Sequence, residues 1–314
     1  FIDNIHIEEY SNIVLFLTHL SNDPFIYISL VEKSKSVFSD VLPIRLENDI
    51  EEINKLIEVI PELYLEARSV EDVRKEKIEE KDETEIGDKY GADSANGDEK
   101  EYDELNIVAR INTSFKTIEI VGQLVRKYYA KIKSVEKYEL INETFNLGLR
   151  TLNVILSLIA KNKELFINEF GKVVQTNKKM KKEEAVKEIK KFLFAICNLL
   201  SYSMLRRIST SIGSEDLSVT FDKILRDNLS NSNYLILCAI KLEHFHGFPL
   251  SDIEKAKKML ENNPLAYINL KQLVINYLYM FNIDQKLRSQ VCSLLGIPVL
   301  EQLLIEKKSP VKKK

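Results

Sequence analysis

The sequence has 314 residues, of which 45% are hydrophobic, and a formal net charge of -3. Such a length and apolar content suffice for one large globular domain or two ordinary ones. Nine glycines and seven prolines provide few of the turns that many short strands need, so composition favours an all-α protein over an all-β one. The longest apolar runs are much shorter than the roughly 20 residues that span a bilayer. We therefore expect no transmembrane segment, and the three widely separated cysteines indicate a cytoplasmic protein.

The chain opens with Phe1, and its first methionine is Met180. We therefore expect it to be the carboxy-terminal part of a longer protein, with any catalytic head among the preceding residues. The composition divides the chain into an amino-terminal helical segment at 1–75, an acidic flexible linker at 76–103, a carboxy-terminal helical domain at 104–306 and a basic tail at 307–314.

The linker expectation depends on charge and glycine content. Between Glu71 and Glu104 there are 15 acids and 6 bases, and the stretch from Gly87 to Gly97 has three glycines and little to bury. Segments of like charge and low hydrophobicity rarely pack, which favours a solvated tether. The alternative is a nucleic-acid mimic or an exchangeable acidic flap over a basic face, although no residue spacing supports it specifically.

Two helices are predicted before this linker. Asp23 followed by Pro24 is typical of a helix start, with an N-cap and then a proline whose missing N–H costs nothing at the first helical position. Isoleucines recur at three- and four-residue spacing from Asn48 to Ile60, which predicts an amphipathic helix that ends before Pro61.

Two longer helices are predicted after the linker, at 105–128 and 140–159, and we expect them to pair as a hairpin. Gly122 and Gly148 lie inside them. Because glycine in a helix costs about 1 kcal/mol relative to alanine, we interpret both as sites of close helix contact.

Shorter helices are predicted toward the carboxy terminus, after a basic helix at 181–207. Ser251 and Glu254 have the spacing of a capping box that begins a helix ending at Asn262. Asn263 and Pro264 then start another helix, and a helix at 283–295 ends at Gly296. The expected architecture is a multi-helix bundle or an irregular array of helical hairpins, without a repeat of fixed period.

The sequence shows no short motif for catalysis or for a cofactor. It contains no GxxxxGK[ST], GxGxxG or GxSxG, and we expect no enzyme activity, cofactor or metal. His244 and His246 point about 200° apart on a helix, which argues against a shared metal. The three cysteines are expected to be buried, reduced thiols: Cys197, Cys238 and Cys292. An active site assembled from distant helices leaves no short motif and remains an alternative.

Basic residues supply the candidate site. We predict that a group of lysines and arginines forms an anion- or partner-binding surface: Lys178, Lys179, Lys181, Lys182, Arg206 and Arg207. The alternative is an ordinary exposed helix, since Glu183, Glu184 and Glu188 lie among the lysines at salt-bridging offsets.

Four stretches, at 111–123, 145–152, 263–267 and 277–281, resemble the helical carboxy-terminal region of bacterial STAND-type NTPases of antiphage defence. The resemblance covers roughly 105–304 and implies a sensor region that holds an amino-terminal effector inactive. Neither Walker motif is present, so no nucleotide-binding or catalytic residue of that family has a counterpart in this sequence.

These observations together predict a non-catalytic recognition or scaffold module that binds a macromolecular partner and controls an effector outside this chain. A protein partner is expected, and the oligomeric state is left open. One alternative is a regulatory substrate or inhibitor released by cleavage or displacement of the acidic linker. Another is a helical nucleic-acid-binding protein, whose affinity would fall steeply with salt.

Overall fold

The computed structural model describes residues 1–5, 7–21, 23–65, 71, 75, 102–178 and 181–299. These residues form an all-α protein, as the composition predicts. They divide into two compact units, each taken by itself below. Unit 1 comprises residues 1–60 and 106–270, and unit 2 comprises residues 61–105 and 271–314. Most of the expected linker and the whole expected basic tail lie outside the described residues.

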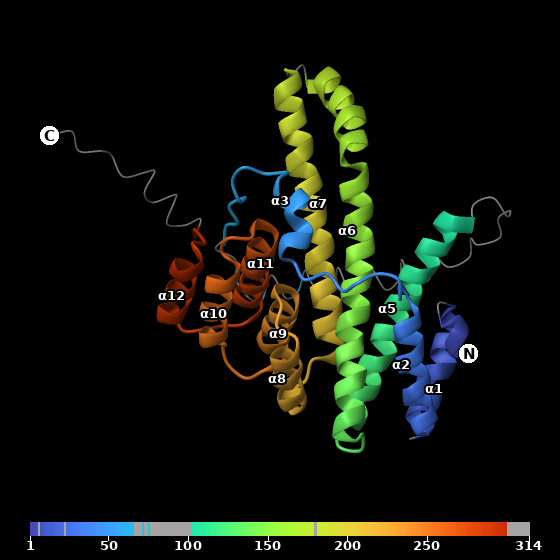
Figure 1. Cartoon of the computed structure of the whole chain (residues 1–314). Coiled ribbons are helices and arrows are strands. Elements are labelled where there is room, and N and C mark those ends of the chain that lie inside the picture. Colours follow the sequence, from blue (N-terminus) through green and yellow to red (C-terminus); the bar gives the residue numbers. More distant parts are fainter. Residues whose placement is uncertain are drawn as a thin grey trace. The chain divides into compact units, whose positions relative to one another are not determined.

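The helices follow one another through short connections over most of the described chain (Figure 1). Their bounds, with 3-10 helices marked η, are η1 Ile2–Asn4, α1 Glu8–Leu20, α2 Pro24–Ser36, η2 Asn48–Ile50, α3 Glu51–Asn54, α5 Tyr102–Tyr128, α6 Ser134–Lys178, α7 Lys182–Ile212, η3 Glu215–Leu217, α8 Ser218–Asp227, α9 Asn231–His244, α10 Leu250–Leu260, α11 Pro264–Met280 and α12 Gln285–Leu295.

A long hairpin of α6 and α7 forms the frame of unit 1. Figure 1 shows the two helices side by side, and α2 packs against α6 while α9 packs against α7. The prediction that 105–128 and 140–159 pair as a hairpin is therefore wrong, because α6 forms its hairpin with α7. Helix α5 contacts α6 through a small apolar cluster in which Ile118 packs with Leu147 and Phe38.

Two glycines set the spacing of this frame, and their predicted close contacts are confirmed. A Cβ on Gly122 of α5 would lie 2.3 Å from the carbonyl oxygen of Ser211 on α7. A Cβ on Gly148 of α6 would lie 2.5 Å from Cδ1 of Ile208, also on α7. Only a residue without a side chain lets the three helices approach this closely.

The amino-terminal helices are fixed to α6 by polar contacts. The predicted N-cap of α2 is confirmed, because the Asp23 carboxylate accepts a hydrogen bond from the Phe25 backbone N–H at 2.9 Å. At the other end of α2, buried Arg150 donates to the carbonyls of Ser34 and Val37 at 2.7 and 3.3 Å. Buried Glu143 neutralises this arginine at 2.7 Å.

The amphipathic helix expected at 48–60 is wrong in its length. The chain forms η2 and then only the single turn α3, which ends at Asn54. Ile50, Ile53 and Leu56 are buried. Their spacing of three residues suits tight 3-10 and turn geometry, so the core is filled without a longer helix. The Asn54 side chain also accepts from the Leu265 N–H at 3.0 Å, which fixes the end of α3 to the start of α11.

The capping box expected at Ser251 is also wrong. Helix α10 begins one residue earlier, at Leu250, and the Pro249 carbonyl accepts from the N–H groups of Asp252 and Ile253, both at 3.1 Å. Ser251 is thus already inside the first turn. The helix ends at Leu260 rather than at Asn262.

In unit 2, the predicted end of α12 is confirmed. Gly296 has a φ of 61°, and the Ile297 N–H bonds to the Cys292 carbonyl at 2.9 Å, which closes the last turn. Just beyond it, the Leu65 N–H donates to the Pro298 carbonyl at 2.9 Å. An isolated bridge between Leu65 and Val299 accompanies this bond.

Candidate partner-binding surface

The predicted basic residues do not gather at one place. Lys178 ends α6, while Lys181 and Lys182 lie at the start of α7; Lys179 is outside the described residues. Arg206 and Arg207 follow Lys182 by 24 and 25 residues along the same helix. At 1.5 Å per residue the separation is about 36 Å, so lysines and arginines cannot bind one small anion together.

Arg206 is engaged inside the protein. Its Nε and Nη2 atoms donate to Oε1 of Glu243 on α9 at 2.9 and 2.5 Å. The other carboxylate oxygen accepts from the hydroxyls of Ser209 and Thr210 at 2.8 and 3.2 Å. Charge-assisted, two-pronged contacts of this kind fix geometry strongly. Arg206 therefore links α7 to α9 within the protein.

Arg207 has a different neighbour. Its guanidinium carbon lies 4.1 Å from the centroid of the Phe115 ring on α5, within the range of a cation–π contact. The exposed arginine thus packs α7 against α5 in the region where Gly122 meets Ser211. Of the predicted basic surface, the lysines near the turn between α6 and α7 are left as candidates for binding outside partners.

His244 and His246 lie at the end of a helix, as the sequence predicts. Helix α9 ends at His244, and Nδ1 of His246 lies 2.8 Å from Glu215. The half-buried His244 ring packs against Gly213, and its burial lowers its pKa. Among the described residues, no group of three or more His, Cys, Asp or Glu is placed to hold a metal ion.

The cysteines are buried and free of disulfides, as predicted. Burial raises the pKa of Cys197 to about 12 and also raises the pKa values of Cys238 and Cys292. Because the thiolate is the reactive form, these thiols are poor nucleophiles near neutral pH.

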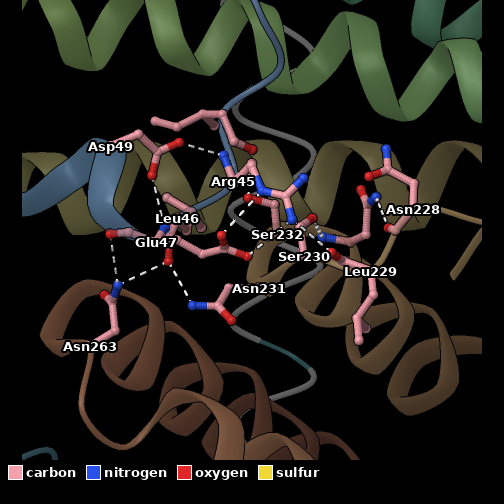
Figure 2. A network of polar contacts seen from close by, with 12 residues as sticks. Arg45, Leu46, Glu47, Asp49, Asn228, Leu229, Ser230, Asn231, Ser232 and Asn263 are labelled. Carbon is pink, nitrogen blue, oxygen red and sulfur yellow. Dashed lines mark hydrogen bonds and ion pairs between the residues drawn. The ribbon is translucent and has the colours of Figure 1, made fainter.

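A polar network that short motifs do not reveal binds the extended segment before α3 to the start of α9 (Figure 2). The Ser232 hydroxyl donates to the Ile44 carbonyl at 2.7 Å, and the Ser232 backbone N–H donates to the Arg45 carbonyl at 3.0 Å. The Asn231 side-chain amide donates to the Leu46 carbonyl at 2.8 Å. Three successive carbonyls of the segment thus meet donors at a helix N-terminus.

Asn263 extends this network to α11, as Figure 2 shows. Its side-chain amide donates to the carbonyls of Leu46 and Glu47 at 2.9 and 3.2 Å. Its side-chain oxygen accepts from the Ala266 N–H at 3.2 Å, which makes it the N-cap of α11. The expected helix start at Asn263 is therefore confirmed. Because its donors are used by the chain's own backbone, the network is an internal joint.

A sequence signal for this joint exists at residues 230–233, which read Ser-Asn-Ser-Asn immediately before an apolar run. Ser230 is the N-cap of α9, and its hydroxyl accepts from the Asn233 N–H at 3.2 Å. The cluster could have been read as a helix start. Its second role, binding a segment more than 180 residues earlier, has no counterpart in local sequence.

The distal part of the α6–α7 hairpin carries the exposed features of the candidate surface. We define residues 160–200 as the arm, and Figure 1 shows the far ends of both helices extending beyond the other helices of unit 1. The arm has ten lysines and five glutamates, a net charge of +5. Near its base, Lys163 pairs with Glu52, and Lys187 lies 3.5 Å from Glu58.

Large apolar side chains are exposed on both helices of the arm. On α7, Phe192 is 59% exposed and Leu199 is 58% exposed, although Leu193 and Phe194 between them are buried. On α6, Leu165 is 59% exposed and Phe170 is 51% exposed. Single exposed hydrophobics are normal on a protein surface, and these four make the arm the candidate for an interaction surface.

The amino-terminal helices border a separate hollow of about 580 Å³. Its lining combines apolar side chains with five polar or charged residues, Asp3, Ser29, Glu32, Lys33 and Ser36. The Lys33 ammonium already donates to the Asp3 carbonyl at 2.9 Å. The lysine that lines the hollow is therefore already bonded within the protein.

None of the described helices is long and apolar enough to cross a membrane. Comparisons of the chain with protein-family models, with curated proteins and with solved structures found no match.

Proposed function

We propose that this chain is a non-catalytic helical recognition module that binds a macromolecular partner through the arm. The observation that carries the proposal is the combination of exposed apolar side chains and excess positive charge on one projecting pair of helices. Protein interfaces commonly combine an apolar centre with a charged rim. The arm offers both on a backbone held rigid by helical hydrogen bonds.

The sequence resemblance over roughly 105–304 gives this proposal a biological setting. A sensor region of a larger bacterial defence protein would bind its trigger and pass its occupancy to an effector outside this chain. The resemblance is the support for that setting, and the arm is the support for partner binding. The two parts of the proposal can therefore fail independently.

Affinity capture with the full chain as bait tests partner binding. The double variant Phe170→Ser/Phe192→Ser removes one exposed aromatic from each helix of the arm, and Val219→Ser on α8 is the matched control, since Val219 is 77% exposed and outside the arm. We expect a partner that is retained by the wild-type chain and the control and lost from the double variant. Equal recovery with all three baits would contradict the proposal.

A second candidate function is nucleic-acid binding, which the exposed Lys181 and Lys182 at the tip of the arm favour. Capture from lysates with and without nuclease separates it from protein binding. Recovery that disappears with nuclease, with an affinity that falls steeply with salt, would support it. The further alternative of a cleavable acidic linker concerns residues 76–103, most of which lie outside the described residues.

A further inference from the structure

One face of α6 changes along its length from covered to exposed. In the body of unit 1, Leu147 is buried with Ile118 of α5, and Val154 packs against the same cluster. Leu158 and Leu165 continue this face at intervals of four and seven residues, which keeps them on one side of a helix. Leu158 is 40% exposed, and Leu165 is 59% exposed.

The exposed part of this face extends to the end of the arm. Val173 follows Leu165 by two helical turns and is 54% exposed. By contrast Ile167, which lies on the opposite side of α6 from Leu165, is buried. We call the exposed set Leu158, Leu165 and Val173 the α6 seam. It continues the face on which Ile118 of α5 packs together with Val37 and Phe38 nearer the base.

The charges beside the α6 seam indicate what covers it. Lys161 lies between Leu158 and Leu165 in sequence and is exposed, and Lys172 precedes Val173. Lys172 is paired with Glu169 at 2.9 Å, but both side chains are at least 60% exposed, so the pair contributes little and can exchange partners. With a net charge of +5 on the arm, a complementary surface is acidic.

We propose that the α6 seam binds an amphipathic helix of a partner protein, with an apolar stripe on the seam and acidic residues facing Lys161 and Lys172. A helix is the occupant because Ile118, a side chain of helix α5, already packs with Leu147 on the same face of α6. A second copy of the arm would bring like charge to like charge. Nucleic acid would leave the leucines and the valine of the seam without apolar contacts. This inference rests on the proposed function and specifies the partner's chemistry.

The test uses the full chain and two designed peptides of about 20 residues, long enough to be helical once bound. Both carry the same leucine stripe; one has glutamates beside the stripe and the other has lysines. Fluorescence anisotropy measures binding of each peptide. We expect the acidic peptide to bind and the basic peptide to bind at least roughly tenfold more weakly, because each charge contact changes sign.

Variants of the chain locate the site. Leu165→Ser/Val173→Ser removes two exposed apolar side chains of the seam and should weaken binding of the acidic peptide roughly tenfold or more, whereas Val219→Ser should leave that binding unchanged. Lys161→Glu/Lys172→Glu should reverse the preference between the two peptides. All substituted residues are exposed, so circular dichroism should show an unchanged fold.

Three outcomes would overturn the inference. They are equal affinity of the chain for the two peptides, an affinity for the acidic peptide that the seam substitutions leave unchanged, and no binding of the acidic peptide. Tight binding of duplex DNA or of phosphatidylserine vesicles in place of the acidic peptide would assign the arm to another partner class. If the acidic peptide does not bind but a partner is still captured through the arm, this inference is wrong and the proposed function stands. If capture of the partner also does not depend on the arm, both are wrong.

Discussion

Replacing Gly122 with alanine should destabilise the protein, although alanine is the better helix former. The new Cβ would lie 2.3 Å from the carbonyl oxygen of Ser211 and 2.5 Å from its carbonyl carbon. Carbon–oxygen contacts are normally about 3.3 Å or longer, so α5 and α7 would have to separate by about 1 Å. Both atoms belong to the backbone, and no side-chain rotation can relieve the collision.

The expected magnitude follows from two opposing effects. Overpacking that shifts a helix costs up to about 3 kcal/mol. We expect this upper value for Gly122→Ala because the new Cβ collides with backbone atoms, which cannot rotate away. Alanine in a helix recovers about 1 kcal/mol relative to glycine. The net loss in the free energy of unfolding for Gly122→Ala is therefore about 2 kcal/mol, equivalent to a urea midpoint roughly 1 M lower.

Gly171 provides the matched control. It also lies inside a helix, α6, but nothing is within 4 Å of the position its Cβ would take. Gly171→Ala should therefore stabilise the protein by up to about 1 kcal/mol. Urea unfolding followed by far-UV circular dichroism measures both variants. A Gly122→Ala midpoint at or above the wild-type value would refute the close-contact argument.

A comparison of Gly148 with Gly122 distinguishes a collision with a side chain from a collision with the backbone. Its Cβ would meet Cδ1 and Cγ1 of Ile208 at 2.5 and 2.8 Å, and these atoms can be removed by mutation. In a double-mutant cycle, Ile208→Ala should cost less in the Gly148→Ala background than alone. In the Gly122→Ala background, Ser211→Gly should give little such relief, because the carbonyl of Ser211 remains.

Three further outcomes are expected. Asn263→Ala should lower the free energy of unfolding by about 1–3 kcal/mol because it removes the cap of α11, the side-chain donor to the Glu47 carbonyl and one of two donors to the Leu46 carbonyl, whereas Asn263→Asp should keep the cap and still lose the donors, as thermal unfolding would show. Glu243→Gln should cost about 2 kcal/mol in urea unfolding, since it removes the charge that compensates partly buried Arg206; an unchanged midpoint would contradict that role. Burial raises the pKa of Cys197 from the ordinary 9.0 to about 12, so its contribution to stability is fully present below pH 9.0 and is lost as the pH rises toward 12. Native thiols should accordingly react slowly with Ellman's reagent at pH 8 and rapidly in denaturant, and fast reaction of the native protein would contradict this.

The sequence by itself determined the fold class and most of the helix ends that use local chemistry. Asp23, Asn263 and Gly296 were predicted correctly because an N-cap or a left-handed C-terminal residue acts within a few residues of itself. Gly122 and Gly148 were recognised as close contacts because glycine inside a helix carries a cost that packing must offset.

Only the tertiary structure decided which helices pair and which polar groups are used internally. The periodicity of 105–128 shows that the helix has an apolar face, but it does not say that Gly122 meets α7. The isoleucines of 48–60 predicted a long helix, but the core is filled by Ile50 of η2, Ile53 of α3 and Leu56 in the turn that follows. Arg206 was assigned to a binding surface with Lys182, whereas a carboxylate 37 residues away on α9 engages it. Local patterns record which residues prefer to be buried or capped, and the partners that satisfy them are fixed by contacts between distant parts of the chain.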